Sequence, residues 1–109
     1  YPQGIEKVLL RLKKYNLPVL ITENGLADAS DEKRPWFIET TLHSVYNAME
    51  KGADVKGYFH WSLIDNFEWD KGFWPRFGLI SLDRKNLSRK IRKESAEIYS
   101  LIIKKGLNT

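Results

Sequence analysis

The stretch Pro18-Val19-Leu20-Ile21-Thr22-Glu23-Asn24-Gly25 decides how the rest of the chain is interpreted. Its first five residues are a short, partly β-branched apolar run, as expected of a β-strand that is buried on both faces. The run stops at a carboxylate, an amide and a glycine, so the carboxylate of Glu23 is expected to project at the carboxyl end of the strand. Parallel α/β folds place their active sites at that end of their strands.

The segments on both sides of this strand have the period of helices. Upstream, apolar residues recur at spacings of three and four, which predicts an amphipathic surface helix over residues 5–15. Downstream, a polar loop is followed by Pro35, which can open a second helix, and Gly52 is a plausible end for it. The apolar positions of this second helix step by four, three and four: Ile38, Leu42, Val45 and Met49.

The remainder of the chain continues the alternation. Residues 55–61 are rich in aromatic side chains and predict a second strand, and residues 62–76 predict a long functional loop. Residues 77–83 predict a short extra strand, and residues 94–105 a final helix that Gly106 ends. This order is that of a parallel α/β architecture. Two parallel strands cannot satisfy both sheet edges, so the pattern indicates part of a larger unit such as a (β/α)8 barrel, which needs about 250 residues.

Composition excludes several classes of protein. The 109 residues are 42% hydrophobic and 29% charged, which excludes disordered and low-complexity chains. The longest apolar runs have only three or four residues, far below the roughly 20 that cross a bilayer, so no membrane span is expected. The sequence contains no cysteine, which excludes a thiolate metal site. No secretory signal is visible, and the composition fits a cytoplasmic protein or one from a hot environment.

The net charge of +4 is unevenly distributed, because six basic residues crowd into positions 84–93. Such a run could bind phosphate groups, as in a small basic nucleic-acid binder. The alternative is a solvated loop that leads into a helix. We favour this alternative because no aromatic residue lies between the basic residues for base stacking. No nucleic-acid partner is therefore expected. The six residues are Arg84, Lys85, Arg89, Lys90, Arg92 and Lys93.

A second group of polar residues follows the other predicted strand, in the segment His60-Trp61-Ser62-Leu63-Ile64-Asp65-Asn66-Phe67-Glu68-Trp69. Indoles can stack on the apolar faces of sugars, while carboxylates and amides bind sugar hydroxyls. Glu23 alone could equally cap a neighbouring amide, and either tryptophan alone could pack in a core. Two tryptophans flanking two carboxylates and an amide within nine residues are harder to explain as core, and favour a sugar-binding site.

Three motifs together resemble the carboxyl-terminal portion of a family 1 glycoside hydrolase, the family of retaining β-glucosidases and β-galactosidases. These are Ile21-Thr22-Glu23-Asn24-Gly25, the ten-residue segment that begins at His60, and Arg76-Phe77-Gly78-Leu79. The resemblance covers nearly the whole chain. Gly52-Ala53-Asp54-Val55 and Arg34-Pro35 are especially similar to archaeal, heat-adapted members.

The resemblance implies a fold and a catalytic residue. The strand that ends at Glu23 would be the seventh of a (β/α)8 TIM barrel, and the strand that ends at Trp61 the eighth. Residues 1–109 would then form a carboxyl-terminal segment of one barrel domain, without an internal domain boundary. Glu23 would be the nucleophile that forms a covalent glycosyl-enzyme intermediate, which water opens with retention of configuration.

The resemblance also implies a subsite for an unphosphorylated, terminal β-linked sugar. Trp61 matches a stacking platform, Trp69 a second sugar-contacting indole, and Phe77 an aromatic wall of the same subsite. Glu68 would accept hydrogen bonds from the outer sugar hydroxyls rather than act in catalysis, and its charge would repel a phosphate. The two other polar residues of the motif are interpreted as loop-shaping: Asp65 and Asn66.

A retaining enzyme of this type needs a second carboxylic acid about 5 Å from the nucleophile. The family supplies it from an Asn-Glu-Pro motif on the fourth strand, a tripeptide that this sequence does not contain. The resemblance thus implies partnership with the remaining barrel strands, in the same polypeptide or a partner chain, and homo-oligomers are common in the family. The alternatives are a non-catalytic sugar-binding module and an inactive fragment. No cofactor or metal is implied, because His43 on a helix and His60 in a strand do not make a site.

Overall fold

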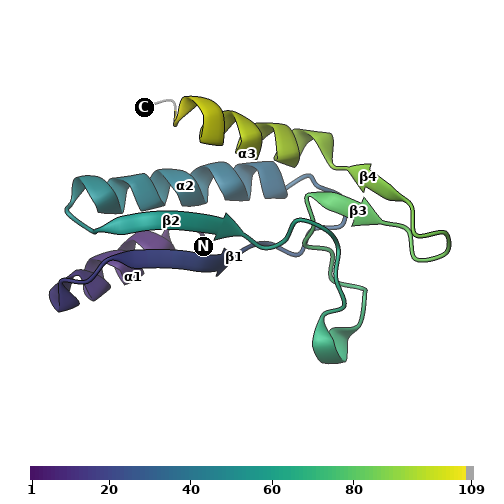
Figure 1. The fold of residues 1–109 in the computed structure, drawn as a ribbon, viewed down its shortest axis with the longest axis horizontal. Coiled ribbons are helices and arrows are strands. Elements are labelled where there is room, and N and C mark those ends of the chain that lie inside the picture. Colours follow the sequence, from purple (N-terminus) through teal and green to yellow (C-terminus); the bar gives the residue numbers. More distant parts are fainter. Residues whose placement is uncertain (108–109) are drawn as a thin grey trace.

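The computed structural model describes residues 1–107 and confirms the predicted alternation of helices and strands (Figure 1). Within these residues no helix has both the length and the apolar character needed to cross a membrane. The elements are α1 (Gly4–Leu12), the 3-10 helix η1 (Lys13–Tyr15), β1 (Val19–Asn24), α2 (Arg34–Glu50), β2 (Val55–His60), the 3-10 helix η2 (Trp69–Lys71), β3 (Ile80–Leu82), β4 (Arg89–Ile91) and α3 (Lys93–Lys105).

The core lies between the helices and one face of the parallel pair β1–β2. Four buried residues form its centre: Leu9, Val45, Ala48 and Ala53. Val19 and Ile21 of β1 and Val55 of β2 pack against this cluster, and α2 contacts both α1 and α3. The alternation of side chains along each strand turns every second residue toward these helices.

The other face of β1–β2 is open, and the prediction that the first strand is buried on both faces is wrong for this chain. Leu20 of β1 is 51% exposed and Phe59 of β2 is 58% exposed. The apolar cluster of the described residues lies on one side of the sheet only, so alternate side chains of each strand face solvent. The candidate active site includes a carboxylate on this uncovered face of the sheet.

The two ends of α2 explain its length. Pro35 stands in its first turn, where the missing N–H costs nothing. The carboxylate of Asp28 accepts the Lys33 N–H at 2.8 Å and the Arg34 N–H at 3.0 Å, which satisfies amides at the start of the helix. Gly52 has a φ of 89°, a left-handed conformation that suits glycine, and it follows the end of the helix as predicted.

The basic segment forms half of a β-hairpin, so its interpretation as a loop leading into a helix is wrong in part. β3 and β4 pair antiparallel, with Ile80 opposite Ile91 and Leu82 opposite Arg89. The extra strand predicted over residues 77–83 is shorter than expected. Burial does not alternate along either strand, since all three residues of β3 are half-buried and all three of β4 are exposed.

Candidate active site

A register shift places Glu23 on the open face of the sheet. Ile21 pairs with Tyr58 and Asn24 with His60, so between these two pairs β1 contains one residue more than β2. An extra residue of this kind is a β-bulge, and it reverses the alternation of side chains beyond it. Thr22 and Glu23 are accordingly both exposed, whereas strict alternation would turn Glu23 toward the helices with Val19 and Ile21.

The ends of β1 and β2 are in backbone contact beside Glu23. The Trp61 N–H donates to the Asn24 carbonyl at 2.8 Å, and the Tyr58 hydroxyl donates to the Asn24 side-chain oxygen at 2.9 Å. A Cβ at Gly25 would lie 1.8 Å from the Trp61 carbonyl oxygen, so only glycine fits there. This contact brings the backbone of Trp61 next to Asn24, the residue that follows Glu23.

Phe77 is held beside Trp61 by the backbone. The Ser62 N–H donates to the Phe77 carbonyl at 3.2 Å, and the Leu79 N–H donates back to the Ser62 carbonyl at 2.9 Å. The Asp28 N–H and the guanidinium of the fully buried Arg34 both donate to the Arg76 carbonyl, at 2.9 and 2.7 Å. The loops that follow β1 and β2 and the segment before β3 therefore meet at one place.

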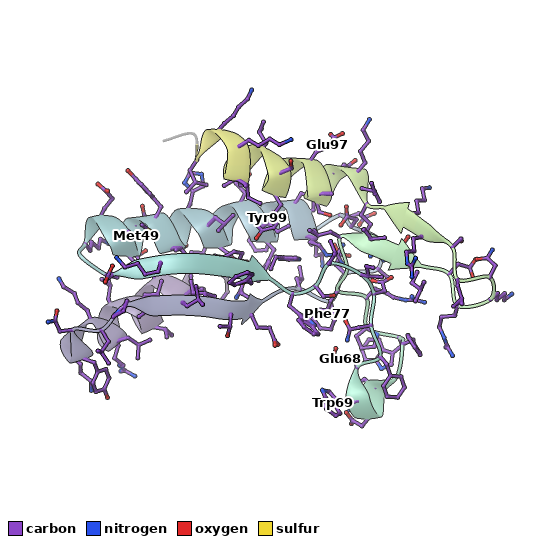
Figure 2. The ribbon with its side chains drawn as sticks, in the orientation of Figure 1. Met49, Glu68, Trp69, Phe77, Glu97 and Tyr99 are labelled. Carbon is purple, nitrogen blue, oxygen red and sulfur yellow. The ribbon has the colours of Figure 1, made fainter. Side chains whose placement is uncertain are left out.

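Glu68 and Trp69 project from this meeting point on a loop, with Phe77 at its base (Figure 2). The Asn66 side-chain amide donates to a Glu68 carboxylate oxygen at 2.7 Å, and the Glu68 N–H donates to the Gly72 carbonyl at 2.7 Å. Trp69, in η2, is 83% exposed, which leaves its indole free to contact a ligand. The loop-shaping role predicted for Asn66 is consistent with these bonds.

Asp65 holds the base of the same loop. Its carboxylate accepts the Gly78 N–H at 3.0 Å and two bonds from Arg92, at 2.9 and 3.1 Å, and it also lies 3.3 Å from Arg76. Burial alone would raise the pKa of Asp65, but the hydrogen bonds from Arg92 and Gly78 outweigh it and lower the pKa. The sequence predicted a loop-shaping role for Asp65, and these contacts confirm it.

His60 lies under the site as a neutral ring. Burial, followed by the nearby positive charge of Arg34, lowers the pKa of His60 to about 4. Its ring centroid lies 5.8 Å from that of Tyr99 in α3. Among the described residues, no group of three or more His, Cys, Asp or Glu side chains is placed to hold a metal ion.

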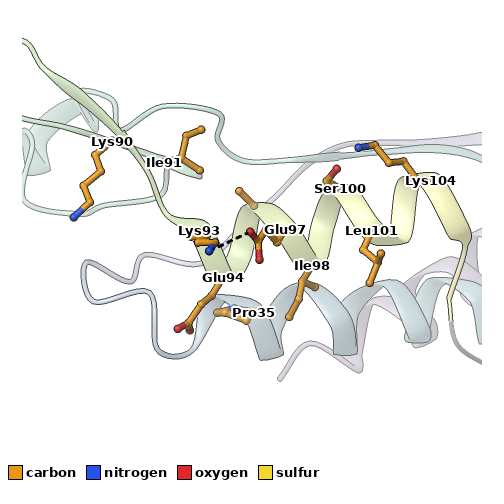
Figure 3. A pocket seen from close by; sticks show the side chains of 11 residues that line it. Pro35, Lys90, Ile91, Lys93, Glu94, Glu97, Ile98, Ser100, Leu101 and Lys104 are labelled. Carbon is orange, nitrogen blue, oxygen red and sulfur yellow. Dashed lines mark ion pairs between the residues drawn. The ribbon is translucent and has the colours of Figure 1, made fainter.

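A groove of about 1130 Å³ runs along α3 (Figure 3). Its walls come from Pro35 in α2, from Lys90 and Ile91 in β4, and from α3. An ion pair joins Lys93 to Glu97 along α3, one helical turn apart, at 3.9 Å. The predicted site residues are not among those that line it.

The sequence reasoning missed Arg34 and Arg92, which fix the geometry of the site. In the sequence Arg34 stands out only as part of a helix start, and Arg92 only as part of a basic run. Their partners lie far away in the sequence, since Arg34 binds the carbonyl of Arg76 and Arg92 the carboxylate of Asp65. The spacing of apolar residues along the chain cannot predict a contact between residues 27 or more positions apart. The only local signal is that each arginine stands at the start of a predicted helix.

Barrel enzymes have their active sites at the carboxyl ends of their strands, where this chain places Glu23 and, in the segment after β2, Trp61, Glu68 and Trp69. The sequence comparisons give the family. The sequence profile of glycosyl hydrolase family 1 matches residues 1–107, and the chain belongs to this family. The predicted resemblance is thereby confirmed.

Individual relatives agree with this assignment. The chain is 43% identical over 103 residues to a β-galactosidase from Pyrococcus woesei, covering 94% of this chain and 20% of that protein. It is 42% identical over 110 residues to a β-galactosidase from Saccharolobus solfataricus, covering 100% of this chain and 22% of that protein. It thus spans about a fifth of the length of these relatives.

The solved structures show the same fold. The crystal structure of a hyperthermophilic β-glucosidase from Pyrococcus furiosus superposes with a TM-score of 0.91 at 45% identity, over 98% of this chain and 23% of that chain. The solved family 1 β-glucosidases are (β/α)8 barrels, which confirms the predicted α/β barrel class. The similarity to heat-adapted enzymes agrees with the resemblance drawn from the sequence.

Proposed function

We propose that this chain supplies the seventh and eighth strands of a (β/α)8 barrel and the nucleophile of a retaining β-glycosidase. The substrate is a terminal β-linked, unphosphorylated sugar of the glucoside or galactoside type. The remaining strands come from the same polypeptide or from a partner chain. Residues 1–109 form one carboxyl-terminal segment of that single domain.

The placement of Glu23 is the observation that carries the proposal. The register shift in β1 turns this carboxylate onto the open sheet face, at the carboxyl end of the strand. In a closed barrel the face opposite the helices is the interior, which opens at that end onto the active site. A nucleophile must reach the anomeric carbon from the barrel interior. Strict alternation along β1 would have turned the Glu23 carboxylate toward the helices instead.

The surrounding side chains suit the binding of a sugar. Trp61, Trp69 and Phe77 offer aromatic faces for the C–H groups of a pyranose ring. Glu68 accepts hydrogen bonds from its outer hydroxyls, and the bond from Asn66 holds the carboxylate in place. The same negative charge disfavours a phosphorylated sugar.

The reaction follows from this placement. The Glu23 carboxylate attacks the anomeric carbon, the glycosidic C–O bond breaks, and a glycosyl ester forms on Glu23. A carboxylic acid from the missing strands gives its proton to the leaving oxygen and later removes a proton from the water that opens the ester. Two displacements at one carbon retain its configuration.

The test uses a hybrid enzyme in which this chain replaces the matching segment of the Pyrococcus furiosus β-glucosidase. The hybrid is incubated with an activated 2-deoxy-2-fluoro-β-glucoside, which forms the glycosyl ester but opens slowly. Peptide mass spectrometry then locates the label. The control is Glu32→Ala, which removes an exposed carboxylate from the polar loop after β1.

We expect the label on the peptide that contains Glu23. The variant Glu23→Ala should lose turnover by about 10⁴-fold or more, as for other covalent nucleophiles, and azide should restore part of it. A folded hybrid that hydrolyses glucosides without label on Glu23, or that binds sugar without turnover, would overturn the proposal. The second outcome would favour a non-catalytic sugar-binding module.

A further inference from the structure

Arg92 differs from the other members of the basic run. Its side chain is 10% exposed, whereas Lys90 and Lys93 on either side of it are exposed residues. It stands between β4 and α3 and turns inward, toward the base of the loop that carries Glu68. A buried guanidinium needs acceptors for its donors, and this one has three.

The acceptors of Arg92 belong to the two segments that border the proposed sugar subsite. Its two terminal nitrogens donate to the two oxygens of Asp65, at 2.9 and 3.1 Å, and one of them also donates to the Gly78 carbonyl at 2.5 Å. Gly78 directly follows Phe77, and Asp65 lies three residues before Glu68. One side chain therefore fixes both walls of the subsite.

The two segments touch closely, and Arg92 adds side-chain hydrogen bonds to the backbone bonds that already join them. A Cβ at Gly78 would lie 2.3 Å from the Asp65 nitrogen, and the Asp65 N–H donates to the Ile80 carbonyl at 3.0 Å. The Asp65 side chain is 1% exposed, so it has no water to replace a lost partner. A lysine at position 92 would keep the charge but lose the planar fork that binds both carboxylate oxygens.

A short chain of hydrogen bonds continues from this pair to the subsite. Asn66 follows Asp65, accepts a bond from the Ser62 hydroxyl at 3.3 Å, and donates to the Glu68 carboxylate at 2.7 Å. The direction of the Glu68 carboxylate is thus set by Asn66, whose backbone is held by the Arg92–Asp65 pair. The carboxylate must point correctly to receive sugar hydroxyls.

We propose that Arg92 is a positioning residue for sugar recognition, which acts on the Glu68 carboxylate through Asp65 and Asn66. The inference rests on the proposed function and names a residue outside the three sequence motifs. A purely structural role would lower stability and all kinetic parameters alike. A positioning role predicts that the effect of Arg92 disappears once Glu68 is gone.

The test is a double-mutant cycle in the hybrid enzyme, with kcat and KM measured for an aryl β-glucoside. We expect Arg92→Lys to lower kcat/KM about tenfold, mainly through a higher KM, in the background that keeps Glu68. In the Glu68→Ala background the same change should alter kcat/KM less than about twofold. Lys90→Met, which changes an exposed residue of β4 two positions before Arg92, is the matched control and should leave both parameters unchanged.

The inference is overturned when Arg92→Lys has the same effect in both backgrounds, or none in the first. Where Arg92→Lys does not fold, Arg92→Gln, which keeps one amide donor toward the Asp65 carboxylate, carries the same expectation. Labelling of Glu23 by the fluoroglucoside in the unsubstituted hybrid is measured in parallel. Loss of that label refutes the proposed function, whereas an intact label with additive effects refutes only the role of Arg92.

Discussion

Replacement of Gly25 by alanine tests whether the contact between the two strand ends holds the site together. The added methyl carbon would lie 1.8 Å from the Trp61 carbonyl oxygen and 2.9 Å from its carbonyl carbon. Both atoms are backbone, so no rotamer change relieves the clash. To reach even 3.0 Å the strand ends must separate by at least 1.2 Å, the difference between the two distances.

The expected cost follows from the contacts that this separation disturbs. A backbone shift forced by an added methyl group costs about 1–3 kcal/mol. The hydrogen bond from the Trp61 N–H to the Asn24 carbonyl, now 2.8 Å, would break and cost about 1 kcal/mol more. The total is about 2–4 kcal/mol, which corresponds to a fall in Tm of roughly 8–16 °C for a chain of this size.

Gly57→Ala is the matched control, because Gly57 stands in the partner strand. A Cβ there would lie 2.6 Å from the terminal carbon of Leu20, a side chain that is 51% exposed and can rotate away. We expect its cost to stay below about 1 kcal/mol. Thermal unfolding of the chain and its two variants, followed by circular dichroism, gives the comparison. Equal Tm values for the two variants would refute the reasoning that the close approach at Gly25 is rigid.

Two further predictions concern His60 and Glu68. The folded-state pKa of His60, about 4, lies below its ordinary value of 6.5, so its neutral form contributes stability that is complete above pH 6.5 and is lost as the pH falls to 4. Allowing for the part of the ring that faces solvent, the free energy of unfolding measured with urea should be about 2 kcal/mol lower at pH 4 than at pH 7.5. His60→Gln should remove most of that difference, whereas His43→Gln should not. An unchanged difference in His60→Gln contradicts the buried, neutral ring. In the hybrid enzyme, Glu68→Ala should lower kcat/KM by about 10- to 100-fold, mainly through KM, because a charged acceptor for non-reacting hydroxyls is lost. Steady-state kinetics at the full parental rate would exclude this role.

Local sequence was sufficient for the order of the helices and of the two parallel strands, and for the family. The apolar period of residues 5–15, Pro35 at the start of α2 and Gly52 after its end are decided by neighbours in the chain, and the structure places these elements as expected. The motifs around Glu23 and Trp61 also follow from local order, because Glu23 lies at the end of β1 and Trp61 directly after β2. Their position at the carboxyl ends is a property of strand direction alone.

Tertiary structure decided which way the side chains point and what holds them. The bulge that turns Glu23 to the open face exists only because β1 pairs with β2, so no reading of β1 by itself reveals it. The hairpin in the basic run depends on a backbone ladder that carries no side-chain pattern. Arg92 lies 27 residues from Asp65 in the sequence, and only the folded chain selects this one arginine from the six basic residues of its run. Sequence determined which chemical groups are available, and packing across the chain determined their geometry.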